Sequence, residues 1–257
     1  MENNRCIIIL SEKSSGSSAL MKYLLRYEDI HAVKHTRHNE RETLFWTKAA
    51  SILGLPQKKL VGSEVPIEKG KALWQLVNFM ARNIPCYSDK RLAPWFDVVL
   101  RWEKLCKRYA PVFLEKSPHY LANWSNLDCI KDMISLLDFE GDIVHQIVGL
   151  VRHPLNTLYS IHRRWKLNLH EYEKQWRRSY TNLLRLKKIL PDKVHIVKYE
   201  DMCKTANHLK PVIEFAGYKD VKEAGFREPR KIPESFKFKL QESTIKLAEE
   251  FGYERIQ

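Results

Sequence analysis

The first segment of the chain with the residues for chemistry is a hydroxyl-rich loop. Residues 11–18 read Ser-Glu-Lys-Ser-Ser-Gly-Ser-Ser, between an apolar run at 5–10 and a helix-like pattern at 19–25. A loop that joins a strand to a helix N-terminus directs backbone N–H groups and the positive end of the helix dipole toward one point, which favours an oxyanion. The segment therefore predicts a site for a phosphorylated ligand. An ordinary turn with Ser17 or Ser18 as the helix N-cap is the structural alternative.

This loop differs from the one that binds nucleoside triphosphates. In the pattern Gly-x-x-x-x-Gly-Lys-[Ser/Thr], lysine follows the second glycine and the hydroxyl holds magnesium. Here Lys13 precedes Gly16, and Ser17 occupies the position after the glycine. Hydrolysis of ATP or GTP is therefore disfavoured, and a P-loop kinase for a small molecule remains an alternative.

A second candidate anion-binding segment lies in the middle of the chain. A buried-strand pattern at 144–152 ends in Arg152-His153-Pro154, and proline suits a first helical turn because its missing N–H would have no partner there. Arg152 could bind a phosphate through its guanidinium fork, and Ser160 on the following helix could add a hydroxyl. A salt-bridged arginine and a solvent-facing serine are the alternative.

Both segments resemble the sulfotransferases that use 3'-phosphoadenosine-5'-phosphosulfate (PAPS). The loop 13–18 is similar to their 5'-phosphosulfate loop, and Arg152 with Ser160 is similar to their 3'-phosphate-binding motif. Glu-Lys-Ser-Pro-His-Tyr at 115–120 is similar to a segment of the carbohydrate-type branch, and Val-Lys-Tyr-Glu-Asp-Met at 197–202 is similar to a strand-ending motif of many members. The C-terminal 247–253 resembles a common bacterial-type C-terminal helix. One departure is that Ser14 and Ser15 both separate Lys13 from Gly16, where the family usually has one residue, and Glu12 replaces a frequent proline.

The resemblance implies a fold and a donor site. The fold would be α/β, a P-loop NTPase-like three-layer fold with a central parallel sheet flanked by helices, in a single domain 1–257 whose acceptor region spans about 28–110. PAPS would be the co-substrate, with no metal. The residues implied to bind it are Lys13, Ser14, Ser15, Gly16, Ser17, Ser18, Arg152, Ser160 and Tyr199.

The catalytic groups follow from what sulfuryl transfer needs. Lys13 and the loop N–H groups would stabilise the leaving phosphate, and Lys116 would contact the sulfuryl or acceptor oxygen. Arg41-Glu42-Thr43-Leu44-Phe45-Trp46 is similar to a family segment that carries a glutamate base, so Glu42 is the first candidate for the general base. Cytosolic members use a histidine, and the alternative bases are therefore His35, His38 and His119.

Composition limits the partners without selecting one. The 257 residues carry a net charge of +13, which suits PAPS, an acidic glycan or nucleic acid. We expect a small-molecule or glycan acceptor rather than nucleic acid, and leave the oligomeric state open. A non-catalytic basic module that binds glycans or nucleic acid through charge is the other alternative.

The cysteines and the apolar runs bear on the compartment. Five widely spaced cysteines without a Cys-x-x-Cys pair favour buried, reduced thiols over disulfides or a zinc site. No signal-peptide pattern precedes the first strand, and no apolar run reaches the roughly 18 residues that span a bilayer. A cytoplasmic location is expected, with the luminal domain of a trimmed membrane-anchored enzyme as the alternative.

Apolar periodicity predicts alternating strands and helices. Strands are expected at 5–10, 111–115, 144–152 and 194–199, and helices at 19–25, 69–82, 94–109, 123–137 and 154–190, the last divided near Asn168. Residues 28–68 are polar and rich in glycine and proline, so they are expected to be irregular. Because ligands bind at the carboxyl ends of parallel strands, the four strand ends should meet at one edge of the sheet.

Aromatic residues are concentrated between the loop and the strand that carries Lys116. At helical spacing such residues usually lie in the core, and one or two could instead stack on an acceptor ring or sugar. The residues concerned are Phe45, Trp46, Trp74, Phe79, Trp95, Phe96 and Trp102.

Overall fold

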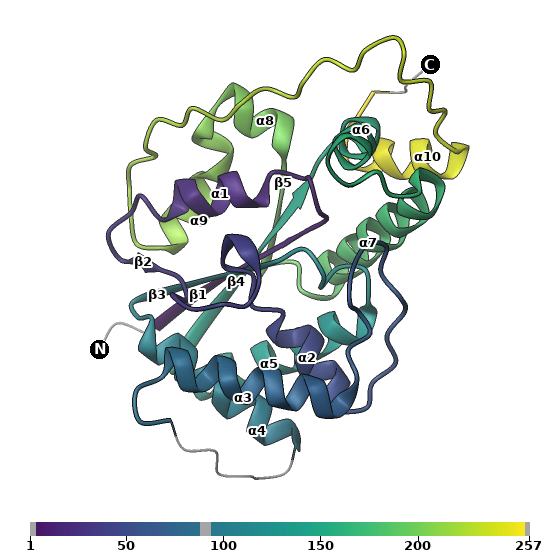
Figure 1. Ribbon diagram of the computed structural model, residues 1–257. Coiled ribbons are helices and arrows are strands. Elements are labelled where there is room, and N and C mark those ends of the chain that lie inside the picture. Colours follow the sequence, from purple (N-terminus) through teal and green to yellow (C-terminus); the bar gives the residue numbers. More distant parts are fainter. Residues whose placement is uncertain (1–3, 88–93, 255–257) are drawn as a thin grey trace.

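A parallel sheet forms the centre of the computed structural model, which describes residues 4–87 and 94–254 (Figure 1). Within this described part the sheet has five strands in the order β2-β3-β1-β4-β5, and all neighbouring pairs are parallel. The strands are β1 (Asn4–Ser11), β2 (Ile30–His31), β3 (Val112–Ser117), β4 (Ile143–Val151) and β5 (Val194–Lys198). Their β-branched, apolar sequences suit a sheet that is covered on both faces.

Helices cover both faces of the sheet and give three layers (Figure 1). Side chains alternate along β1, so Ile7 and Ile9 pack on one face with α1 (Ser17–Leu24), α8 (Tyr199–Lys204) and α9 (Lys210–Phe215). Cys6, Ile8 and Leu10 pack on the opposite face. The helices there are α2 (Phe45–Ile52), α3 (Lys69–Asn83), α4 (Pro94–Arg108), α5 (Trp124–Glu140), α7 (Leu169–Ile189) and α10 (Glu242–Glu250).

The predicted helix pair at 154–190 is confirmed, and its division has a local cause. Helix α6 (Pro154–Trp165) begins with its proline in the first turn and ends at Lys166, whose φ of 50° is left-handed. Asn168 then caps α7, because its side chain accepts a hydrogen bond from the Glu171 N–H. The other predicted strands and helices are also present, with bounds that differ by a few residues.

The prediction that residues 28–68 are irregular is wrong in part. They include β2, a 3₁₀ turn at Asn39–Arg41 and the helix α2. All residues of α2 are buried, including the polar Thr47, Lys48 and Ser51. The helix has only eight residues, and apolar periodicity is read over a window of roughly 11 to 18, so the sequence pattern did not reveal it.

The prediction that most of the aromatic residues are core is confirmed: Phe45, Trp46, Phe79 and Trp102 are buried, and Trp95 is partly buried against the core. The exceptions are Trp74 and Phe96, which are 64% and 55% exposed. These two lie on the outer sides of α3 and α4, where helical spacing alone does not say which residues face the sheet.

The sequence analysis did not identify the elements between β5 and the C-terminal helix. Helix α8, a 3₁₀ turn at Ala206–Leu209 and α9 follow β5 directly. Residues 218–241 then run without helix or strand along the top of the molecule in Figure 1, from α9 to α10. None of the helices in the described part has the length and apolar character that a membrane crossing demands.

Candidate active site

One cavity of about 940 Å³ lies at the carboxyl ends of the parallel strands. The pairing register places Leu10 beside Ser117 and Ser11 beside Leu150, so β1, β3 and β4 end at the same edge of the sheet. The predicted residues that line this cavity are Lys13, Ser14, Gly16, Ser17, Ser18, His38, Glu42, His119, Arg152, Ser160 and Tyr199. The edge of the sheet thus brings together side chains from segments far apart in the sequence, as the strand pattern predicts.

The loop before α1 turns through two left-handed residues. Ser14 has φ 63° and Gly16 has φ 95°, and α1 begins directly afterwards at Ser17. A Cβ atom on Gly16 would lie 2.3 Å from the ring of Tyr199. Only glycine satisfies both the backbone conformation and this close approach. The first N–H groups of α1 therefore adjoin the cavity, and these groups have no partner within a helix.

Glu12 anchors the loop, a role that the sequence analysis did not assign. Its buried carboxylate accepts hydrogen bonds on Oε2 from Tyr172 (2.7 Å) and Gln175 (3.0 Å), and on Oε1 from Ser179. All three donors lie on α7. Burial raises the pKa of Glu12, and these hydrogen bonds offset part of that effect. The signal in the sequence was an acidic residue directly after a buried strand, where a charge needs partners.

Ser15 differs from the rest of the loop. Its side chain is buried and its hydroxyl lies 3.0 Å from the Tyr180 hydroxyl on α7. Among the described residues, it is the one loop member between Lys13 and Ser18 that does not line the cavity. Ser15 thus joins Glu12 in fixing the loop to α7, away from the cavity in which the sequence analysis expected it to bind the donor.

Arg152 contacts both Ser14 and Tyr199 beside Gly16, and we call these four residues the loop wall. Arg152 donates from Nη1 to the Ser14 carbonyl at 2.8 Å, and its guanidinium lies 4.9 Å from the centre of the Tyr199 ring. The Tyr199 hydroxyl donates to the Arg227 carbonyl at 2.6 Å. The Nε atom of Arg152 is buried without a hydrogen-bond partner, which leaves a donor for an anion. Ser160 lines the same cavity from α6.

Lys116 lies at the end of β3 between the loop and Glu42. Its fully buried Nζ is 3.2 Å from the Ser18 hydroxyl and 3.1 Å from Glu42 Oε1. A buried ammonium of this kind needs such partners. Lys13 also reaches into the cavity, with Nζ 2.7 Å from the Gly62 carbonyl, and burial lowers its pKa.

Glu42 is held by a strained segment that is tied to the sheet. Glu40, Arg41 and Leu44 all have φ between 51° and 59°, a left-handed conformation that is costly for residues other than glycine. A hydrogen bond to the sheet holds this segment in place: the Thr43 hydroxyl donates to Glu115 Oε1 at 2.6 Å. Glu42 therefore pairs with Lys116, and Thr43 pairs with Glu115. Two consecutive residues of the strained segment are thus joined to two consecutive residues of β3.

Other charged side chains line the cavity near Glu42. Glu64 lies 2.9 Å from Lys71 and 3.4 Å from Nε2 of His38. Burial raises the pKa of Glu64, but the contact with Lys71 outweighs it, and the net direction is downward. We call Arg37, His38, Glu40, Glu42 and Glu64 the acidic wall. Arg37, Glu40 and Glu64 were not identified as site residues, because nothing local in an irregular segment shows which charges face inward.

The three candidate histidines lie in different surroundings. His119 lines the cavity, and burial together with Lys13 lowers its pKa to about 3. A histidine that binds a proton so weakly is a poor general base at neutral pH. Burial and Lys48 also lower the pKa of His38. His35 is exposed and is not one of the described residues that line the cavity.

Comparisons with known proteins identify similar structures. No protein-family model matches the sequence, and no curated protein matches it. A sulfotransferase domain from the olefin synthase of Synechococcus PCC 7002 matches with a TM-score of 0.63 and 19% identity, over 98% of this chain and 96% of that one.

Two further structures agree with this match. A sulfotransferase domain from the curacin biosynthetic pathway gives a TM-score of 0.60 at 17% identity over 100% of both chains. A sulfotransferase from Alicyclobacillus acidocaldarius gives 0.51 at 15% identity, over 98% of this chain and 91% of that one. This chain thus has the fold of the sulfotransferase domains, a P-loop-like parallel sheet with helices on both faces, as its sequence motifs predicted.

Proposed function

We propose that residues 1–257 form a PAPS-dependent sulfotransferase domain that acts on a hydroxyl or amine of an acceptor, with a carbohydrate as the first class to test. One observation carries the proposal: a single cavity adjoins the loop at 13–18, the Lys116–Glu42 pair, and Arg152 with Ser160. The fold, which is that of sulfotransferase domains, supports it.

The donor would lie along the loop wall. The N–H groups at the start of α1 suit the 5'-phosphosulfate, because a helix N-terminus favours an anion. The guanidinium of Arg152, with its unpartnered Nε, suits the 3'-phosphate, and Ser160 would add a hydroxyl. Gly16 lets the loop backbone pack directly against the Tyr199 ring, which supports the loop beside the helix N-terminus.

Transfer would proceed in line between two oxygens. The acceptor oxygen forms a bond to sulfur while the bond from sulfur to the 5'-phosphate oxygen breaks, and the acceptor proton passes to a Glu42 carboxylate oxygen. Lys13 and Lys116 would stabilise the charge that develops on the leaving phosphate and the sulfuryl oxygens. Before the donor binds, the ion pair with Lys116 holds Glu42 in place.

The leaving group would be 3'-phosphoadenosine-5'-phosphate, a phosphate end rather than a chelating polyphosphate, so we propose that the transfer needs no metal. The unpaired state of all five cysteines supports a reducing compartment, and we propose the cytoplasm.

Calorimetry with 3'-phosphoadenosine-5'-phosphate, ADP and magnesium-ATP tests the donor. We expect the 3'-phosphorylated nucleotide to bind most tightly without metal. Tighter binding of magnesium-ATP would support the P-loop kinase instead. Equal and strongly salt-dependent affinity for all three would support the basic module, since binding by charge alone weakens steeply with salt.

A further inference from the structure

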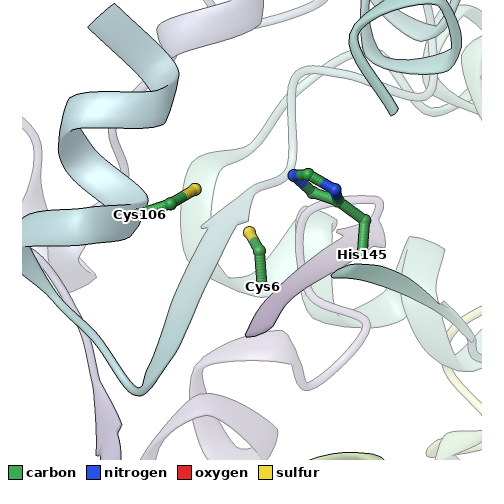
Figure 2. Close-up of side chains that lie close together, drawn as sticks. All are labelled: Cys6, Cys106 and His145. Carbon is green, nitrogen blue, oxygen red and sulfur yellow. The ribbon is translucent and has the colours of Figure 1, made fainter. Parts of the chain in front are cut away.

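Two cysteines and a histidine meet in the core, at the end of the sheet away from the cavity. Cys6 lies near the start of β1, His145 is its neighbour on β4 in the pairing register, and Cys106 lies in the last turns of α4. Their sulfur and nitrogen ligand atoms all lie within 4.8 Å of one another, and Figure 2 shows the three side chains directed toward a common centre. All three residues are buried, with at most 1% of each exposed.

The hydrogen bonds of His145 leave one ring nitrogen without a proton. Nδ1 lies 2.7 Å from Asp138 Oδ1, and Asp138 also pairs with Lys193. The Trp102 indole donates to Nε2 at 3.3 Å. Because an indole N–H can only donate, Nε2 must be the acceptor, and the proton of the neutral ring is on Nδ1. A histidine whose Nδ1–H donates to a carboxylate is a common arrangement for binding a metal through Nε2, and a metal there would take the place of the hydrogen bond from Trp102.

The three side chains can hold a divalent cation without net charge. Two thiolates and a neutral imidazole balance the charge of the ion, so the buried site has no net charge to desolvate. Binding the ion releases the two thiol protons.

We propose that Cys6, Cys106 and His145 bind a thiophilic d¹⁰ metal ion, Zn²⁺ or Cu⁺, that joins α4 to β1 and β4 and takes no part in sulfuryl transfer. Two thiolates and an imidazole are the ligands that both ions favour. Ligand atoms at about 2.0 to 2.3 Å from one ion lie about 3.5 to 4 Å apart, so small side-chain shifts would close the site. The sequence disfavoured a zinc site because it has no Cys-x-x-Cys pair; the fold supplies the proximity that the spacing does not show.

Metal content and metal titration test this proposal. The full chain, expressed in zinc- or copper-supplemented medium and purified without a metal-affinity tag, is expected to hold about one equivalent of metal by elemental mass spectrometry. The medium that loads the site distinguishes Zn²⁺ from Cu⁺. The reduced, metal-free chain titrated with Co²⁺ is expected to develop a thiolate-to-cobalt absorption band that saturates at one equivalent.

Variants separate this cluster from other thiols. Cys106→Ala is expected to lose the metal and the cobalt band, whereas Cys129→Ala removes a buried thiol from α5 outside the cluster and is expected to keep both. Binding that survives in Cys106→Ala, or the absence of stoichiometric binding in the unaltered chain, would overturn the proposal.

A second measurement covers a Cys106→Ala chain that does not fold. In the unaltered chain under mild urea, one equivalent of metal is expected to slow alkylation of Cys6 and Cys106 at least tenfold and to leave Cys129 unchanged. Equal alkylation rates with and without metal, or a Cys6–Cys106 disulfide found by peptide mapping, would contradict metal binding. Neither outcome depends on sulfotransferase activity.

Discussion

The loop wall and the acidic wall line the same cavity but are constructed differently. The loop wall consists of strand ends and the helix starts that follow them, and its contacts are short: Arg152 to the Ser14 carbonyl, and Tyr199 against Gly16. The acidic wall belongs to an irregular segment in which Glu40, Arg41 and Leu44 are all left-handed. It is joined to the sheet through Thr43 and Glu115, and through Glu42 and Lys116.

This difference indicates where variation is tolerated. A wall made from strand ends inherits its geometry from the sheet, so it suits the donor, which is constant in the proposed reaction. A wall made from an irregular segment can change with few consequences for the core, so it suits the acceptor. The two walls should therefore respond differently to substitution.

Glu42→Gln tests the acidic wall, with the largest expected effect. Loss of the base should lower the transfer rate by about 10²- to 10⁴-fold, while affinity for 3'-phosphoadenosine-5'-phosphate stays within about twofold. Rates with PAPS and an acceptor from a screen, together with calorimetry, measure both. Glu28→Gln changes an exposed carboxylate outside the cavity, so it is the matched control and should change the rate little. Normal turnover in Glu42→Gln would move the base to a histidine.

Arg152→Ala tests the loop wall and should have the opposite profile. Loss of a charged hydrogen-bonding partner should lower the affinity for 3'-phosphoadenosine-5'-phosphate by roughly 10- to 100-fold. The affinity for adenosine-5'-phosphosulfate, which lacks the 3'-phosphate, should stay nearly unchanged. Competition binding of the two nucleotides measures the ratio. Arg163→Ala, on the exposed side of α6, is the control. An unchanged ratio in Arg152→Ala would remove the 3'-phosphate from this end of the cavity.

Gly16→Ala tests whether nucleotide binding needs the close packing of Gly16 against Tyr199. The new Cβ would meet the Tyr199 ring at 2.3 Å, so nucleotide affinity should fall about tenfold or more. Gly54→Ala provides the comparison: Gly54 is also left-handed, with φ 71°, but no atom lies within 4 Å of its Cβ position. It should cost roughly 1 kcal/mol of stability and no affinity. Similar affinities in the two variants would show that the close packing at Gly16 is unimportant.

Glu115→Gln examines the link between the acidic wall and the sheet. Burial raises the pKa of Glu115 from 4.5 to about 7, so between these pH values the folded chain binds more protons than the unfolded chain. Raising the pH from 5 to 8 should therefore destabilise the unaltered chain, by up to about 3 kcal/mol from this group. The Glu115→Gln variant should lose less stability over the same pH range. Urea unfolding at both pH values measures the difference, and parallel curves for the two proteins would contradict the raised pKa.

The two walls also differ in how far the sequence predicted them. The loop and Arg152 were accessible because parallel strands end at one edge, so local patterns were sufficient. Tyr199 and Glu42 were proposed only through a family resemblance. Arg37 and Glu64, which line the cavity with Glu42, were not identified, because the path of residues 28–68 depends on long-range contacts such as Thr43 to Glu115. Helix α2 was missed for a different reason: its eight residues are too few for a helical period to stand out.

The contact of Gly16 with Tyr199 has a consequence for folding. The loop directly follows strand β1, but its wall is completed by Arg152 and by Tyr199, whose hydroxyl donates to the Arg227 carbonyl. A fragment that ends before Tyr199 carries strand β1 and the loop without the surface that shapes them. Order at 13–18 would therefore report that the segments after β4 and β5 have docked.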